Sequence, residues 1–247
     1  MATQTFNTPL LLRPVPARLP DKDQAALIAL ADQALTLPAM SVMDKQAVPP
    51  SGDKHDWANL ADYTWPNPDT PDGLPYVNRD GQANPEAGQY DRPTFHRFLL
   101  AVLRLTAAWR LTRQRRYADK ARDLLEHWFI RPDTAMNPNQ NYAHYVPGTG
   151  KGRKDGLIVC CGALPTLLDL WLVLWRDGVI DDKSNQMMEL WIRQFLDWFI
   201  TDPMSLEHAA IINNHGSFHQ MLHANLLLHC GHRDEAMAAL TESLGPW

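Results

Sequence analysis

Long stretches of the chain carry apolar side chains at the spacing of an α-helix and alternate with long irregular segments, and strand patterns are weak throughout. In residues 183–201, for example, large apolar residues return every three or four positions. This periodicity predicts an all-α fold, built from helix pairs that are joined by long loops on one side. The predicted helices are 22–36, 93–113, 115–130, 156–177, 183–201, 214–230 and 232–244.

Length and composition set the class of protein. The 247 residues are enough for one domain with a large core, and we predict a single domain over residues 1–247. Hydrophobic residues make up 45% and charged residues 21%, as in ordinary soluble globular proteins. No apolar run reaches the roughly 20 residues that span a bilayer, so no membrane partner is predicted.

Charge and cysteine usage exclude further classes. The net charge of −5 argues against a nucleic-acid partner. The three cysteines have no zinc-binding spacing and are predicted to be free buried thiols. The first 16 residues have no basic region and only a short apolar stretch, so they show no signal peptide.

Residues 39–92 show no pattern typical of a helix or a strand. They are rich in Pro, Gly, Asp and Asn, yet they contain Trp57, Tyr63, Trp65 and Tyr76. A disordered linker would lack such aromatic residues. We therefore predict an ordered loop that packs across a face of the domain, and loops of this length are usually functional.

Asn213, Asn214 and His215 stand immediately before a helical pattern. One interpretation is structural, with an asparagine capping the helix that follows. The other is functional: amides and the positive end of a helix would bind a carboxylate, and the imidazole would act as a base beside it. The residues alone leave both open.

His215, His219 and His223 are spaced four residues apart, so they form one stripe on a helix. Such a stripe could hold zinc, but the zinc-protease pattern needs Glu where Gly216 stands. We predict no metal site.

Two polar loops have the composition of a sugar-binding surface. Residues 137–145 combine amides, an imidazole and phenols, and basic residues follow closely. Amides bind hydroxyl groups and Arg or Lys pairs with carboxylates. Residues 51–57 have a similar composition, and for both loops a purely structural role stays open.

Four motifs occur in an order that resembles the alginate lyase superfamily. They are SVMDKQAVPPSGDKHDW, YTWPNPDTPDGLPYVNRDGQANPE, MNPNQNYAHYVPGTGKGR and NNHGSFHQ. The resemblance runs from about Ser41 to about Glu235 and is strongest to polysaccharide lyase family 38, with the alginate lyases of family 5 as relatives. It implies an (α/α) toroid and β-elimination on uronic-acid polymers, with no metal and no cofactor.

The resemblance also implies roles for particular residues. Asn214, alone or with Asn213, and a basic residue would neutralise the C6 carboxylate of the sugar. His215 or a tyrosinate would remove the C5 proton. A tyrosine would then protonate the leaving oxygen; Tyr142 and Tyr145 are the candidates, and Tyr142 is counted among the catalytic residues. The predicted substrate-binding residues are Lys54, His55, Asn137, Asn139, Asn141, Arg153, Asn213, His219 and Trp65.

The sequence departs from the family pattern in two places. After NNHG the family usually has a bulky aromatic residue and then Tyr, where this chain has Phe218 and His219. The family also carries a downstream Arg and Tyr on a motif of the type ELART…WHYS, whereas this sequence ends at SLGPW. We therefore expect a toroid that lacks its closing helices.

The resemblance leads to expectations about partner and location. The expected partner is an anionic polysaccharide, and no oligomeric state is predicted. Family members are usually exported, so a periplasmic or secreted location is expected despite the bare N-terminus. Two alternatives stay open: a uronate-binding homologue without activity, and a metal-dependent hydrolase that uses the histidine stripe.

Overall fold

The computed structural model describes residues 20–244, with side chains through residue 241. The first 19 residues, in which the sequence shows no signal peptide, and the last three lie outside the described part. The helices are α1 (Asp21–Leu35), α2 (Asp91–Thr112), α3 (Arg115–Phe129), α4 (Leu157–Cys161), α5 (Leu164–Arg176), α6 (Asp182–Thr201), α7 (Pro203–Ala209), α8 (Asn214–His229) and α9 (Arg233–Leu244). The prediction of a mostly helical fold is confirmed.

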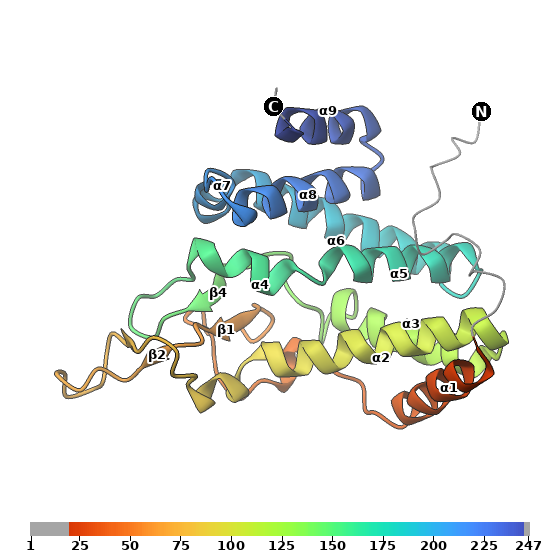
Figure 1. The fold of residues 1–247 in the computed structure, drawn as a ribbon, viewed down its shortest axis with the longest axis horizontal. Helices are drawn as coiled ribbons and strands as arrows, with labels where there is room; N and C mark the ends of the chain where they lie inside the picture. Colours follow the sequence, from red (N-terminus) through yellow and green to blue (C-terminus); the bar gives the residue numbers. More distant parts are fainter. Residues whose placement is uncertain (1–19, 245–247) are drawn as a thin grey trace.

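The long helices form a stack of hairpins (Figure 1). α2 pairs with α3 and α8 pairs with α9, while α5 packs between α2 and α8. α6 contacts both α3 and α8. Their facing sides form one core whose largest buried side chains include Trp128, Phe98 and Phe195.

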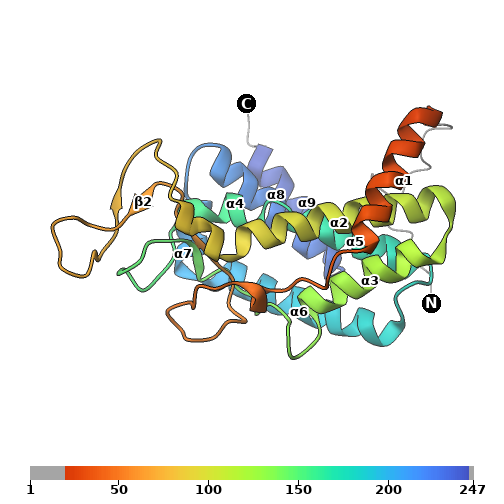
Figure 2. The same cartoon turned by 90° about the horizontal axis from the view of Figure 1, so that it is seen from below.

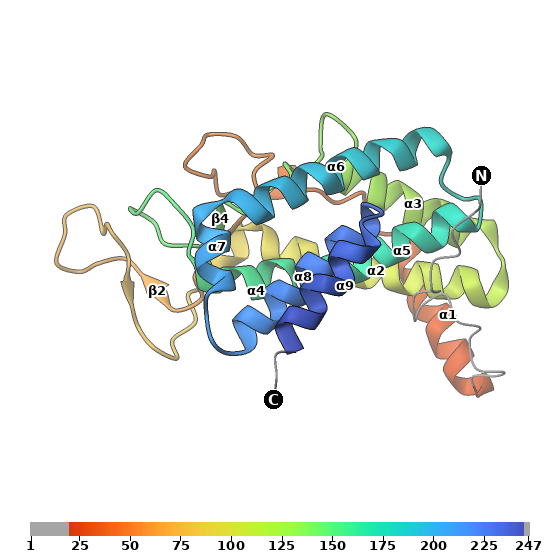
Figure 3. The same ribbon diagram turned by 90° about the horizontal axis from the view of Figure 1, so that it is seen from above.

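Short strands and 3-10 turns occupy the connecting segments. β1 (Ala58–Leu60) pairs in parallel with β4 (Tyr142–Tyr145), and β2 (Thr64–Trp65) pairs antiparallel with β3 (Val77–Asn78). The 3-10 turns are η2 (Val42–Asp44), η3 (Pro85–Gln89) and η4 (Lys154–Gly156). Figures 2 and 3 show that these loops project from the end of the helical body where β4 and α7 lie.

The long segment before α2 is ordered and anchored in the core. Trp57 is 1% exposed, and its ring lies 4.8 Å from that of Phe95 in an edge-to-face contact. Lys45 and Asp91 form an ion pair with Nζ–Oδ2 of 3.0 Å, and neither side chain is exposed. Lys45 also donates to the carbonyl oxygens of Val42 and Lys54, at 2.7 and 2.6 Å. These contacts fix the loop against the start of α2.

The single helix predicted over residues 156–177 is wrong, because the chain bends between α4 and α5. Pro165 lies in the first turn of α5 and has no N–H to donate to the preceding turn.

The prediction that no apolar stretch is long enough to span a bilayer needs a correction. By length and composition alone, Lys154–Arg176 would suffice to cross a membrane. In the fold, 56% of that apolar window is buried inside the protein, as expected of a core helix.

The helix α7 was not predicted. Asp202 caps it, because its carboxylate accepts hydrogen bonds from the backbone N–H groups of Met204 and Ser205, and Pro203 takes the first helical position. An Asp-Pro pair ahead of a short helical pattern was therefore the available signal. α7 brings His208 against α8.

Candidate functional site

The start of α8 brings together the three residues of the Asn-Asn-His motif. Asn213 is the N-cap, and its side-chain oxygen accepts a hydrogen bond from the backbone N–H of His215 at 2.8 Å. The capping interpretation is thus confirmed for Asn213, while Asn214 is exposed at the positive end of the helix. A hollow of about 250 Å³ lies beside this turn, between the end of α7 and Asn213.

Gly216 allows this turn to form. A Cβ atom at Gly216 would lie 2.2 Å from the carbonyl oxygen of Ile211, a backbone atom that cannot move aside cheaply. The glycine after the histidine is therefore required by the close approach of the chain that leads into α8.

Three histidines cluster where α7 meets α8. His208 Nε2 lies 3.2 Å from His215 Nδ1, and the ring centroids of His208 and His219 are 5.8 Å apart. His208 is fully buried, whereas His215 is only partly buried. His219 is 6% exposed, stacks on Phe199 at 4.1 Å and lies 3.1 Å from Ser205 Oγ. The structure thus places the predicted binding residue His219 within the protein, behind His215.

The environment keeps the inner histidines neutral. Burial, followed by the nearby His215, lowers the pKa of His208 to about 4, although the charge of Asp155 opposes the shift. Burial, followed by His208 and His223, lowers the pKa of His219 to about 4. Both imidazoles are therefore uncharged at neutral pH.

These shifts predict that stability falls on mild acidification. In the unfolded chain both histidines recover the ordinary pKa of 6.5. The unfolded state then binds more protons below pH 6.5, so stability is full above that pH and is lost as pH falls towards about 4. Each histidine should lower the free energy of unfolding by up to about 1.4 kcal/mol per pH unit.

The measurement is urea unfolding at several pH values between about 5 and 6.5, compared with a His219→Phe variant. Other titrating groups cancel in this comparison. The wild type should lose more stability with falling pH than the variant, and equal slopes would contradict the prediction.

β4 and the turn after it lie next to this histidine cluster. η4 packs against both α7 and β4, so Asp155 of η4 faces the two elements. Arg153 donates to Asp155 at 2.8 Å, and His144 Nδ1 lies 3.9 Å from the same carboxyl group. The predicted binding residue Arg153 is thus paired with a carboxylate that the sequence did not single out.

Tyr142 stands at the start of β4. It is partly buried, and its ring meets that of Tyr145 edge-to-face at 6.2 Å. Within the described part of the chain, the Tyr142 hydroxyl forms no hydrogen bond, so the structure does not link it to His215. Its catalytic role stays a prediction.

The amide-rich loop is held by carboxylates. Asn137 Nδ2 donates to Asp53 at 3.1 Å and to Asp56 at 2.9 Å, and Asn139 Nδ2 donates to Asp56 at 3.1 Å. Asn141 accepts from Trp198 Nε1 at 2.8 Å. These amides therefore join the two predicted polar loops. Sequence reasoning did not single out Asp53 and Asp56, and their only signal was their place in the polar loop of residues 51–57, on either side of the predicted binding residues Lys54 and His55.

Lys54 and His55 belong to the same junction. The carbonyl oxygen of Lys54 accepts from the buried Lys45, and His55 Nδ1 lies 2.6 Å from the carbonyl oxygen of Ala135. Trp65, by contrast, lies on the β2–β3 hairpin that projects away from the helices (Figure 1). Its Nε1 donates to the carbonyl oxygen of Gln82 at 2.7 Å, and Arg79 covers its ring. The structure does not bring Trp65 together with His215.

No metal-binding group emerges from the histidine stripe. Among the side chains described, those of residues 20–241, no cluster of three or more His, Cys, Asp or Glu has the arrangement of a metal site. His219 instead lies within hydrogen-bond distance of Ser205 and stacks on Phe199. The metal-dependent alternative therefore lacks a ligand set in the described part of the protein.

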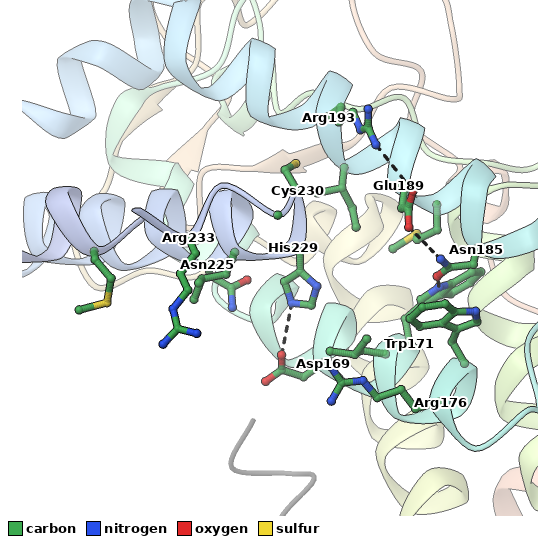
Figure 4. A pocket seen from close by; sticks show the side chains of 17 residues that line it. Asp169, Trp171, Arg176, Asn185, Glu189, Arg193, Asn225, His229, Cys230 and Arg233 are labelled. Atoms are coloured by element: carbon green, nitrogen blue, oxygen red, sulfur yellow. Dashed lines mark hydrogen bonds and ion pairs between the residues drawn. The ribbon is translucent and has the colours of Figure 1, made fainter. Parts of the chain in front are cut away.

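A larger cleft lies elsewhere. It has a volume of about 830 Å³ and is bordered by the ends of α5, α6, α8 and α9 away from His215 (Figure 4). Its polar side chains largely pair with each other: His229 lies 3.3 Å from Asp169, and Arg193 lies 3.7 Å from Glu189. None of the predicted site residues lines this cleft.

Comparison with known proteins agrees with the fold and the motif order. A crystal structure of an alginate lyase from Bacteroides ovatus superposes with a TM-score of 0.82 at 35% sequence identity. The match covers 89% of this chain and 58% of that one, so this chain spans less than two thirds of that protein. No curated protein matches the sequence. The family model for alginate lyases matches residues 41–244, and the chain therefore belongs to the alginate lyase family.

Proposed function

We propose that this protein is a polysaccharide lyase that cleaves uronic-acid polymers by β-elimination within an (α/α) toroid. The observation that carries the proposal is the start of α8, where an exposed amide and a partly exposed imidazole share the positive end of a helix. The hairpins α2–α3 and α8–α9, with α5 and α6 between them, would form part of the toroid wall.

The proposed chemistry starts with the carboxylate of the sugar. Asn214 and the helix N-terminus would bind the C6 carboxylate and neutralise its charge. This lowers the pKa of the C5 proton and stabilises the enolate-like charge that develops when that proton leaves. Asn213 contributes by capping: its side chain fixes the backbone on which Asn214 and His215 stand.

His215 would remove the C5 proton, and the C4–O bond would then break with formation of a C4–C5 double bond. Tyr142 is the proposed donor of a proton to the leaving glycosidic oxygen. Arg153 and Lys54 add positive charge near the two polar loops, where an anionic chain would pass. Polymannuronate, alginate and glucuronan are the proposed substrates.

The test is ultraviolet absorbance during incubation with polymannuronate, polyguluronate and glucuronan, with a neutral mannan as control. Elimination creates a conjugated double bond that absorbs, whereas hydrolysis does not. We expect absorbance to rise with at least one polyuronate and not with mannan. New reducing ends without absorbance would contradict the proposal. Binding without turnover would indicate a uronate-binding homologue.

A further inference from the structure

His208 is a buried histidine that the chemistry above does not use. It lies on α7, is fully buried, and places Nε2 at 3.2 Å from Nδ1 of His215, with the rings at 71°. His208 therefore contacts Nδ1 of His215 and leaves Nε2 of His215 uncontacted. The contact therefore decides which nitrogen of His215 carries a proton.

Only one proton can lie between the two neutral rings. If His208 Nε2–H donates, Nδ1 of His215 accepts and the proton of His215 sits on its Nε2. That nitrogen then has no free electron pair and cannot act as a base. If His208 accepts, Nδ1 of His215 carries the proton, and Nε2 has a free electron pair. The second arrangement requires a neutral His208 with its own proton on Nδ1.

The surroundings of His208 favour the second arrangement. His208 Nδ1 is buried and has no hydrogen-bond partner in the described part of the protein. Asp155 Oδ1 is buried as well, at 3.9 Å from His144 Nδ1. His208 and Asp155 lie on packed elements, α7 and η4, and the negative charge of Asp155 acts on His208. His144, first, and Arg153 lower the pKa of Asp155, so this group is an anion.

The α8 rings of His219 and Phe218 that pack against His208 carry no negative charge. His219 packs beside it from α8 and Phe218 meets it edge-on at 6.3 Å. Burial keeps His208 itself uncharged above about pH 4. A buried donor is stabilised by an anion on the neighbouring element, so the proton of His208 belongs on the Nδ1 side.

We propose that His208 is a positioning residue that accepts a hydrogen bond from His215 Nδ1–H and thereby leaves Nε2 of His215 free as the base, in a tautomer that the negative charge of Asp155 favours. The role of Nε2 as a base rests on the proposed function, whereas the tautomer of His215 does not.

The first test reads the tautomer directly. Long-range ¹⁵N–¹H spectra of the wild-type protein near pH 7 identify the protonated nitrogen of each histidine, and the His215 signal is assigned from its loss in His215→Gln. We expect His215 to carry its proton on Nδ1. Protonation of His215 on Nε2 would overturn the proposal, whether or not the protein is active.

The second test uses paired variants of His208. Glutamine reaches the position of Nε2 with an acceptor oxygen, whereas phenylalanine keeps the ring without an acceptor. His208→Phe should lower kcat by about 10- to 100-fold with KM little changed, by analogy with partners that fix histidine tautomers in metal sites. His208→Gln should recover most of that loss.

Circular dichroism of both variants excludes unfolding as the cause. Equal kcat in His208→Phe and the wild type would overturn the proposal, and so would equal losses in both variants. If no polymer is eliminated by the wild type, the proposed function fails while the tautomer measurement still decides this inference.

Discussion

Replacement of His215 by alanine is expected to lower kcat/KM for elimination by about 10²- to 10⁴-fold, the usual contribution of a general base. The side chain stands on the first turn of α8, is partly exposed and points one ring nitrogen at His208. Its loss removes the group proposed to take the C5 proton, while the helix start proposed to bind the carboxylate remains. Binding of the polymer should therefore change far less than turnover.

The measurement is the initial rate of absorbance increase with the polyuronate that the wild type cleaves, together with a binding isotherm. His232→Ala is the matched control, because His232 is an exposed histidine between α8 and α9 whose ring pairs with Glu235. It should keep wild-type activity. An unchanged rate in His215→Ala would assign the base to another residue, with a tyrosinate as the first candidate.

Asp91→Ala is expected to lower the free energy of unfolding by about 3–5 kcal/mol, since it leaves the ammonium group of Lys45 buried without its counterion. Asp91 also accepts a hydrogen bond from the backbone N–H of Ala58 at 2.8 Å. Burial raises the pKa of Asp91 and lowers that of Lys45, and their contact opposes both shifts. The charges are thus tolerated only together.

Urea unfolding followed by circular dichroism measures this effect. Asp62→Ala is the control, because its ion pair with Arg92 is exposed and should contribute only about 0–1 kcal/mol. A double variant, Lys45→Met with Asp91→Leu, removes both charges and should be more stable than Asp91→Ala. A loss in Asp91→Ala no greater than in Asp62→Ala would contradict the buried-pair interpretation.

The long helices could be predicted because apolar residues recur at helical spacing along the face that each helix buries. α2, α3, α6 and α8 begin and end within two residues of the predicted bounds. The break before α5 could not be found from periodicity, since apolar residues continue through it, although Pro165 marks it. α7 is too short for a periodic pattern to stand out.

The site was predictable only where it is local in sequence. Asn213, Asn214 and His215 form one motif, and their joint position follows from a single helix start. His208 and Asp155 join them through packing of separate elements, for which the sequence holds no spacing rule. The amides of Asn137 and Asn139 were identified by type, but their carboxylate partners come from a loop some 80 residues earlier.

The parallel pairing of β1 with β4 has a consequence for how the protein folds. Ala58 lies opposite Tyr142, so α2 and α3 intervene between the two strands. Closing so long a loop costs chain entropy that a few strand hydrogen bonds cannot repay until the helices have already packed. The polar loops and β4 should therefore acquire their native arrangement late, after the helical hairpins, and a folding intermediate with a formed core would still lack the junction between them.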